Sequence, residues 1–182
     1  MRGRLRGLRE ATGSEVRVVI LQGMKPLNVV GQEPRSQQGM YDERLVTPMR
    51  EDLTSAGFRE LRTAPEVDAT LKDAKGTVLV MVNSVCGCAA GRARPGVKMA
   101  LRGAKTKPDQ LTTVFAGQDR EATQQARSYF GGNPPTSPQV ALFKDGQLVY
   151  LMQRHQIEGR DAPEIAEDLM KAFEKHCSPT AD

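Results

Sequence analysis

The hydrophobic pattern is strongest at residues 77–83, where TVLVMVN runs without a charged residue. Such a short, continuous run of apolar and β-branched residues is typical of a strand buried on both faces, in a sheet that helices cover. Residues 110–117 (QLTTVFAG) predict a second strand of this kind, and residues 58–61 a short extended piece before both. Residues 139–143 (QVALF) and 147–153 (QLVYLMQ) predict two strands that KDG joins as a hairpin.

Apolar residues at helical spacing separate these strands, with polar residues at the expected ends. We expect a first helix with Thr47 as its N-cap and Pro48 as its first residue, ending at Gly57. Thr63 and Glu66 have the spacing of a capping box, in which each side chain bonds to the backbone of the other residue. They predict the start of a second helix.

The later helices carry similar signals. Asp119 is expected to cap a helix, and Asp161 with Glu164 repeats the capping-box spacing near the C-terminus. Between the first two long strands we expect a helix through about Arg102, which contains Pro95. Because proline has no N–H and crowds the preceding turn, it should kink that helix or delay its regular start.

The predicted order from Phe58 onward is β-α-β-α-β-α-β-β-α, with an extra helix in front. The βαβ units require parallel pairing through right-handed crossovers, and the hairpin adds antiparallel strands. The pattern therefore predicts an α/β domain whose central mixed sheet is flanked by helices.

Charge changes this picture only at the N-terminus. The net charge is +4, but residues 1–39 hold 7 of the 26 basic and 3 of the 22 acidic residues, so the whole excess lies there. The remaining chain is neutral and shows no basic motif or RNA-binding aromatic pattern, which argues against nucleic-acid binding.

The N-terminal segment also lacks the marks of a leader or a membrane span. Its apolar stretch VRVVIL at Val16–Leu21 is short, is interrupted by Arg17, and could form at most a short strand. We therefore interpret 1–39 as a disordered basic extension, or as sequence upstream of a natural start at Met40, and 40–182 as a single domain. Without an export signal we expect a cytoplasmic, reducing location, where a framework of structural disulfides is disfavoured.

Candidate chemistry is concentrated in NSVCGCAAGRARPG, which begins where the strand at 77–83 ends. Cys86 lies where a helix should begin, and the N–H groups and dipole of a helix N-terminus favour a thiolate, the attacking species in disulfide exchange. Cys88 is placed to attack a mixed disulfide formed on Cys86 and to leave a Cys86–Cys88 bridge. Gly87 suits the backbone distortion that such a tight bridge requires.

Other interpretations of this pair remain open. Two cysteines could supply half of a metal site, but zinc takes four ligands and only His155, His176 and Cys177 remain as sulfur or imidazole donors. The pair could also be buried without function, although the end of a strand is a poor place for inert packing. Cys177 itself is interpreted as a peripheral thiol near a frayed helix end.

Ser137-Pro138 precedes a predicted strand directly. Proline cannot donate to a strand ladder, so it belongs at the start of a strand. If this peptide bond were cis, the preceding backbone could pair with an extended substrate beside Cys86, but a cis bond is a minority outcome for X–Pro pairs on sequence grounds alone.

The element order resembles the thioredoxin fold, and the chain more closely resembles the bacilliredoxin family of C-G-C proteins. The resemblance is carried by MYDERLVTPMREDLTSAGF at Met40–Phe58, VNSVCGCAAGRARPG at Val82–Gly96, SPQVALFKDG at Ser137–Gly146 and RHQIEGR at Arg154–Arg160. It covers the chain from Met40 almost to its end.

The resemblance implies a cytosolic thiol–disulfide oxidoreductase or isomerase that acts, without a cofactor, on proteins carrying mixed disulfides with a low-molecular-weight thiol such as bacillithiol. It implies Cys86 as nucleophile, Cys88 as resolving cysteine and Pro138 as the cis-proline, with Ser137 and Gly87 also at the substrate. It assigns no chemistry to His155, which we expect to have a structural role at a strand end.

Two further hypotheses belong to other classes of function. Cys86 and Cys88 could form part of a metal-binding or iron–sulfur handling module, or their disulfide state could control an interaction partner. Metal analysis of the purified protein distinguishes the metal-binding module from redox exchange. A protein whose disulfide state controls a partner should instead show little turnover. We expect no membrane and no nucleic-acid partner.

Overall fold

The computed structural model describes residues 39–178, which lie within one compact unit, Glu33–Asp182. The proposed basic extension, apart from Gly39, and the short strand expected at Val16–Leu21 lie outside the described residues. Within them, no helix is both long and apolar enough to cross a membrane.

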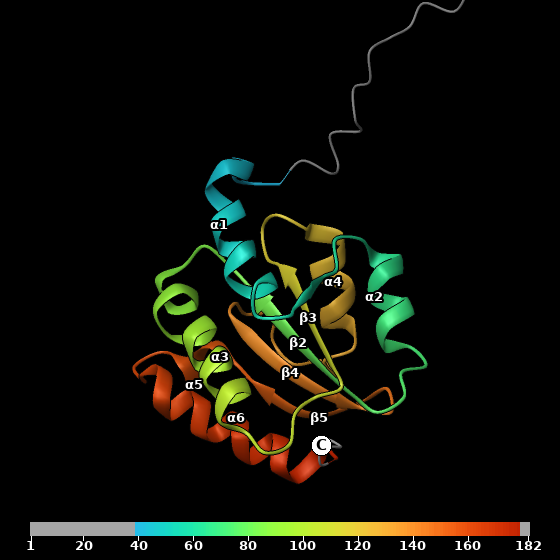
Figure 1. The fold of residues 1–182 in the computed structure, drawn as a ribbon. Coiled ribbons are helices and arrows are strands. Elements are labelled where there is room, and N and C mark those ends of the chain that lie inside the picture. The colour runs from blue at the N-terminus through green and yellow to red at the C-terminus, as the bar shows by residue number, and fades with distance from the viewer. Residues whose placement is uncertain (1–38, 179–182) are drawn as a thin grey trace, which may run out of the picture. The chain divides into compact units, whose positions relative to one another are not determined.

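A five-stranded mixed sheet forms the centre of this unit, with the strand order β1-β3-β2-β4-β5 (Figure 1). Strands β1 and β2 run parallel to β3, whereas β4 runs antiparallel to both β2 and β5. The strands are β1 (Arg59–Glu60), β2 (Thr77–Asn83), β3 (Gln110–Phe115), β4 (Gln139–Lys144) and β5 (Gln147–Met152).

Strand β2 is the central strand, and the continuous apolar run correctly predicted that it is buried on both faces. All seven of its residues are buried, because neighbours pair with both edges and helices cover both faces. Val82, for example, lies opposite Val114 of β3 on one side and Gln139 of β4 on the other. The segment that carries Cys86 and Cys88 begins directly after the end of this strand.

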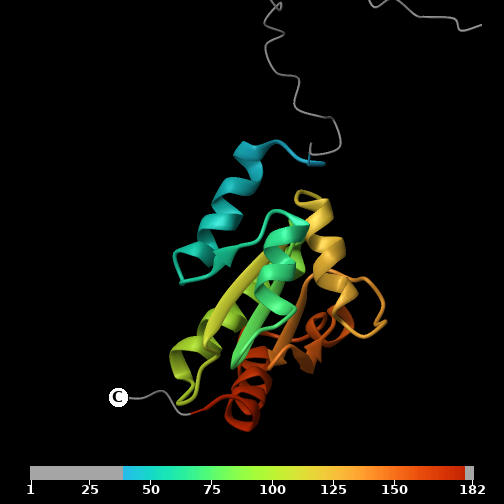
Figure 2. The ribbon, with the colours of Figure 1, turned by 90° about the vertical axis from the view of Figure 1, so that its right-hand side faces the viewer.

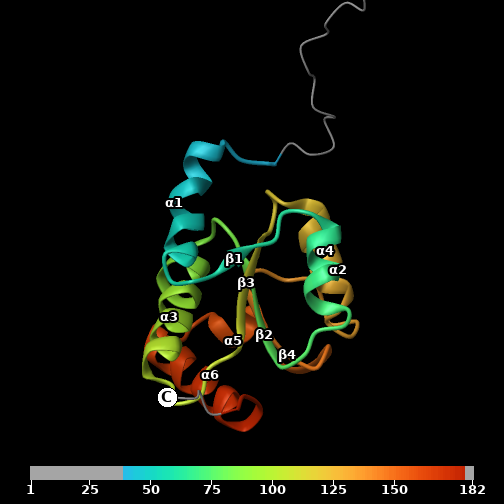
Figure 3. The ribbon, with the colours of Figure 1, turned by 45° about the vertical axis from the view of Figure 1, so that its right-hand side comes forward.

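Helices cover the sheet in two layers (Figure 3). Helices α3 and α6 pack together against one face, and α2 and α4 pack together against the other, where they face the viewer in Figure 2. The helical elements are α1 (Glu43–Thr54), α2 (Ala64–Leu71), the π-helical turn η2 (Ala89–Ala93), α3 (Arg94–Gly103), α4 (Arg120–Ser128), α5 (Arg154–Ile157) and α6 (Ala162–His176).

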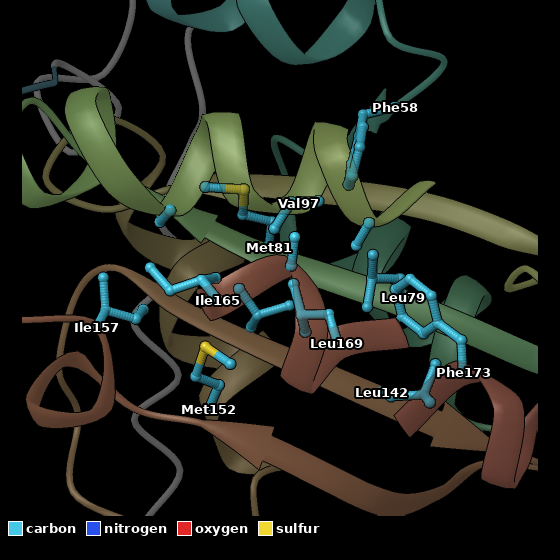
Figure 4. Packing of buried hydrophobic residues seen from close by; sticks show 14 of the residues in the cluster. Phe58, Leu79, Met81, Val97, Leu142, Met152, Ile157, Ile165, Leu169 and Phe173 are labelled. Atoms are coloured by element: carbon cyan, nitrogen blue, oxygen red, sulfur yellow. The ribbon is translucent and has the colours of Figure 1, made fainter. Parts of the chain in front are cut away.

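The alternation of side chains along β2 divides the core into two clusters. Leu79 and Met81 join the cluster under α3 and α6, where Val97, Ile165 and Leu169 pack (Figure 4). The intervening valines of β2 join the cluster under α2 and α4. A strand that is buried on both faces thus supplies apolar side chains to both layers.

The first helix begins earlier than predicted. Asp42, not Thr47, is its N-cap and accepts a hydrogen bond from the Arg44 N–H, while Thr47 donates its hydroxyl proton to the Glu43 carbonyl. Pro48 lies inside the helix, in its second turn. The expectation of a helix start at Thr47 is therefore wrong. Asp42 caps the helix one turn earlier, and the helix tolerates the missing N–H of Pro48.

The later caps were predicted with mixed success. The capping boxes at Thr63–Glu66 and Asp161–Glu164 are both formed, which confirms those two helix starts. Asp119 occupies the N-cap position of α4, but its side chain makes no capping hydrogen bond. Its carboxylate instead accepts two hydrogen bonds from the Arg50 guanidinium.

Pro95 delays the regular helix after the cysteine pair, as predicted. The backbone between Ala89 and Ala93 forms a π-helical turn, in which the Arg94 N–H bonds to the Ala89 carbonyl five residues back. Pro95 then stands near the start of regular α3, where its missing N–H costs least. This local widening lies directly after Cys88.

The observed order reproduces the predicted one, with the one-turn helix α5 as an addition. Two parallel crossovers and a terminal antiparallel hairpin around a central β2 form the predicted thioredoxin-like fold.

Candidate functional site

The C-G-C sequence lies at the carboxyl end of the central strand β2. The strand ends at Asn83, a short turn carries Ser84 to Cys86, and helical backbone begins at Gly87. Cys86 and Cys88 are both partly buried free thiols. The structure therefore places the pair at the predicted junction between strand and helix.

The surroundings of Cys86 stabilise its thiolate. The Ser84 hydroxyl oxygen lies 3.2 Å from the Cys86 sulfur, and it donates when that sulfur is ionised. Burial raises the pKa of Cys86, but hydrogen bonds from Ser84 and from the Ala89 backbone, the Arg154 charge and the Cys88 backbone together lower it below its ordinary value. A lowered pKa supplies more of the nucleophilic form at neutral pH.

Cys88 has a different set of neighbours. Its sulfur lies 3.7 Å from Oε1 of Glu158, to which the thiol donates, and 4.0 Å from Nη1 of Arg92. A carboxylate and a guanidinium thus both contact this sulfur, whereas the side-chain hydrogen-bond partner of Cys86 is a hydroxyl. The two thiols differ in environment although one residue separates them.

Gly87 is exposed and its surroundings are open. A Cβ atom built at this position meets no atom within 4 Å. Steric crowding in the dithiol form therefore does not explain a glycine here. Its predicted contributions to disulfide closure and to substrate binding stay predictions.

The Ser137–Pro138 peptide bond is cis, and Pro138 is buried at the start of β4. The resemblance implied this cis-proline position. Arg154 joins this segment to the cysteines, because its Nη1 donates to the Ser137 carbonyl at 3.5 Å and its charge acts on Cys86. A substrate-binding role of Ser137 and Pro138 stays a prediction.

Sequence reasoning missed two charged residues beside the cysteines. Arg154 and Glu158 form an ion pair at 2.6 Å, with side chains that are 44% and 45% exposed. Both belong to RHQIEGR, a segment that carried the resemblance without any chemistry assigned to it. Their spacing of four residues on a helical turn was the available signal, but the contact of Glu158 with Cys88 depends on the tertiary fold.

A buried arginine supports the turn that carries the cysteines. Arg94 donates to Oδ1 of Asn83 at 3.0 Å, to the Ser84 carbonyl at 3.2 Å and to Asp52 of α1 at 2.8 Å. Asn83 in turn donates to the Met49 carbonyl in α1. The end of β2, the cysteine turn and α1 are thereby held in one hydrogen-bond network.

His155 and Cys177 both occupy positions other than those expected from the sequence. His155 lies exposed in α5, so its expected position at a strand end is wrong, because the segment turns into a helix directly after β5. Its expected structural role stays a prediction. Cys177 is not a frayed peripheral thiol, because it is 8% exposed and packs into the core cluster under α3 and α6. Burial raises its pKa.

Across residues 39–178, no three His, Cys, Asp or Glu side chains come close enough together to hold a metal ion. The contacts of the cysteine pair within this range involve one carboxylate, that of Glu158, which is itself paired with Arg154.

Comparison with known proteins bears on this site. Residues 41–177 match the family described as Disulphide isomerase. A bacilliredoxin from Bacillus licheniformis is 54% identical over 137 residues, which cover 75% of this chain and 95% of the relative. A bacilliredoxin from Koribacter versatilis is 51% identical over 142 residues, covering 78% of this chain and 97% of the relative.

Solved structures with a related arrangement are thioredoxins of low sequence identity. Mitochondrial thioredoxin 3 from Saccharomyces cerevisiae, in its oxidised form, has a TM-score of 0.46 at 17% identity, covering 68% of this chain and 98% of its own. A thioredoxin mutant from Halobacterium salinarum has a TM-score of 0.45 at 17% identity, covering 67% of this chain and 92% of its own. The extent and identity of the sequence matches show that the chain belongs to the bacilliredoxin family.

Proposed function

We propose that this protein reduces mixed disulfides between proteins and a low-molecular-weight thiol, using Cys86 as the nucleophile and Cys88 as the resolving thiol. Membership of the family makes the chain a thiol–disulfide oxidoreductase. The observation that carries the more specific proposal is the position of Cys86, whose sulfur lies at the start of a helical segment and 3.2 Å from the Ser84 hydroxyl.

The proposed reaction is two successive exchanges. The Cys86 thiolate attacks the sulfur of the small thiol in the mixed disulfide, forms a new S–S bond and releases the target protein as a thiolate that takes a proton from water. Cys88 then attacks the Cys86 sulfur, which forms the Cys86–Cys88 disulfide and releases the small thiol. Two electrons pass from the dithiol to the substrate, so the first cycle requires no cofactor.

The substrate class is supported by the family and by two arginines beside the cysteines. The curated relatives carry the name bacilliredoxin, which supports bacillithiol as the small thiol. Arg92 and Arg154 lie beside the cysteines and suit a small thiol that carries carboxylates. The proposal places the reaction in the cytoplasm, where a thiol pool can reduce the resulting disulfide.

The direct experiment follows release of the small thiol from a bacillithiolated or glutathionylated protein. The unsubstituted protein should release it stoichiometrically, and Cys86→Ser should abolish release. Full activity of Cys86→Ser would overturn the assignment of the nucleophile.

Cys88→Ser should instead retain a covalent adduct on Cys86, whose mass identifies the small thiol in a cell extract. An adduct with the mass of a protein would mean that Cys86 attacks the other sulfur of the mixed disulfide. Cys177→Ala is the matched control, because Cys177 lies in the core cluster and should not change release. Normal turnover of Cys88→Ser would show that an external thiol performs the resolving step. Metal analysis of protein purified under reducing conditions tests the metal-binding alternative, which stoichiometric zinc, copper or iron would favour.

A further inference from the structure

Glu158 contacts the second thiol of the cysteine pair, and the two exchange steps give this carboxylate no role. Oε1 of Glu158 accepts from Nε of Arg154 at 2.6 Å and from the Cys88 thiol at 3.7 Å. Glu158 and Cys88 are 70 residues apart in the sequence, so this contact is a product of the fold. The same carboxylate oxygen therefore links the guanidinium and the second thiol.

The ion pair is fixed to the cis-proline segment. The Arg154 N–H donates to Oγ1 of Thr136 at 3.4 Å, and Nη1 of Arg154 donates to the Ser137 carbonyl at 3.5 Å. Its Nε bond to Glu158 then sets the position of the carboxylate. Glu158 is thus held against Cys88 although its side chain is 45% exposed.

The charges around the two sulfurs differ. Cys86 faces the Ser84 hydroxyl, and its nearby charge is the positive Arg154. Cys88 faces the Glu158 carboxylate at 3.7 Å, with Arg92 at 4.0 Å and the Arg154 charge also acting on it. A carboxylate favours the neutral thiol that donates to it and opposes a second negative charge at that distance.

We propose that the Glu158 carboxylate holds the Cys88 thiol as its hydrogen-bond donor and thereby delays closure of the Cys86–Cys88 disulfide. Arg154 is the positioning residue that holds this carboxylate, and its positive charge favours the thiolate on Cys86. The ion pair thus separates the roles of two thiols that lie one residue apart.

This inference rests on the proposed function and adds a control of its second step. Closure requires Cys88 to lose its proton to water; the thiolate then attacks the Cys86 sulfur, a new S–S bond forms, and the bond to the small thiol breaks with its electron pair on the departing sulfur. Because the hydrogen bond from Cys88 to Glu158 must break before this attack, the mixed disulfide on Cys86 lasts longer. During that time a thiol from solution can attack the same mixed disulfide. Glu158 therefore sets what fraction of the mixed disulfide closes internally and what fraction reacts with thiols from solution.

The first test measures Cys88 alone, independently of any turnover. In a Cys86→Ser, Cys177→Ala background, the rate of alkylation by iodoacetamide at neutral pH reports the thiolate of Cys88. Glu158→Gln keeps the size of the side chain and an acceptor oxygen but removes the negative charge, so it should raise this rate about threefold at low ionic strength, with a smaller increase at high salt. Glu158→Asp, which keeps the charge, should give a rate closer to that of the unsubstituted carboxylate.

Glu167→Gln is the matched control, since it removes the carboxylate of another exposed ion pair, Glu167–Lys171 on α6. It should leave the alkylation rate unchanged. An unchanged rate in Glu158→Gln would show that the Arg154–Glu158 pair is only structural and would overturn the proposal.

The second test follows the intermediate in the protein with all three cysteines. After reaction with glutathione disulfide and quenching in acid, mass spectrometry measures the lifetime of the glutathione adduct on Cys86. Glu158→Gln should shorten that lifetime about threefold; a longer lifetime would make Glu158 a proton acceptor for Cys88 and would overturn the proposal. If no adduct forms on Cys86 at all, the proposed function fails, whereas the alkylation test still decides the role of Glu158.

Discussion

Two buried arginines connect α1 to residues at the ends of sheet strands, but only one of them contacts the cysteine turn. Arg50 and Arg94 are each 5% exposed. Arg50 projects from α1 and pairs with Glu60 of β1 and with Asp119 before α4. Arg94 projects from α3 and pairs with Asp52 of α1.

The difference lies in what else each guanidinium contacts. Arg94 also donates to Oδ1 of Asn83 and to the Ser84 carbonyl, and the hydroxyl of the same Ser84 lies 3.2 Å from the Cys86 sulfur. Arg50 instead packs over the Phe115 ring at 5.1 Å. Although the two arginines are similarly buried and similarly paired, we expect Arg50 to contribute only to stability. We expect Arg94 to contribute both to stability and to the position of the Cys86 thiol. Substitutions can separate these two contributions.

The largest stability effect is expected from Arg50→Met. It leaves Asp119, whose side chain is 11% exposed, without the guanidinium that holds both of its oxygens. An uncompensated buried carboxylate should lower the free energy of unfolding by about 3–4 kcal/mol. Urea unfolding measures this loss, and alkylation of Cys86 in the folded variant should stay within about twofold of the unsubstituted rate.

The pH dependence of this loss has a defined sign. Burial raises the pKa of Glu60, but hydrogen bonds from Arg62 and Arg50 lower it below its ordinary value of 4.5. A lowered folded pKa contributes stability that is present above the unfolded value and is lost as the pH falls through the folded one. The difference between Arg50→Met and the unsubstituted protein should therefore narrow below about pH 4.

The control for Arg50→Met is Arg44→Met in the same helix. Arg44 forms an exposed ion pair with Asp42, and its side chain is 92% exposed. This substitution should not change stability measurably. An equal loss in both variants would attribute the effect to helix α1 in general and not to the buried charges.

A smaller stability loss, joined to a change in reactivity, is expected from Arg94→Met. Asp52 is 32% exposed and keeps Lys98 as a partner, and Oδ1 of Asn83 keeps the Ser84 N–H as a donor. The loss should therefore be about 2 kcal/mol, most of it from the unsatisfied Ser84 carbonyl. Because Ser84 is then held less firmly, alkylation of Cys86 at neutral pH should slow about threefold. Arg102→Met, an exposed residue of the same helix, is the control.

Stability loss without any change in Cys86 alkylation would remove the distinction between the two arginines. Both would then be structural, and the position of Ser84 would be set by the backbone of the cysteine turn alone.

The comparison also indicates which parts of the structure the sequence can predict. Strand β2 and the Thr63–Glu66 and Asp161–Glu164 capping boxes depend on neighbouring residues, and each was predicted correctly. The place of Cys86 at the end of β2 follows from the same local pattern. The mixed character of the sheet followed from the crossover and hairpin rules once the elements were known, whereas the strand order was not predicted.

The misses have a common physical cause. Asp119 has a capping side chain by sequence, but Arg50, which is 69 residues away along the chain, takes its carboxylate. Glu158 meets Cys88 only through the fold, and Arg94 reaches the Ser84 carbonyl by a bond that no side-chain pattern encodes. Local signals predict where backbone elements begin, whereas tertiary contacts decide how charged side chains are used.

The smallest stability effect is expected from Ser84→Ala, which removes the hydroxyl at the end of the Arg94 network. The backbone bonds of Ser84 to Asn83 and Arg94 remain, so the free energy of unfolding should change by less than about 1 kcal/mol. The Cys86 thiolate loses a donor, however, and its pKa should rise toward the ordinary value, because this hydrogen bond is the largest of the interactions that lower it. Alkylation of Cys86 at neutral pH should slow about fivefold, and its pH profile should shift upward.

Ser84→Thr, which retains a hydroxyl, should keep most of the rate if the side chain fits. An unshifted pH profile in Ser84→Ala would mean that the Arg154 charge and the helical N–H groups suffice to ionise Cys86, and that Arg94 acts on the site only through stability.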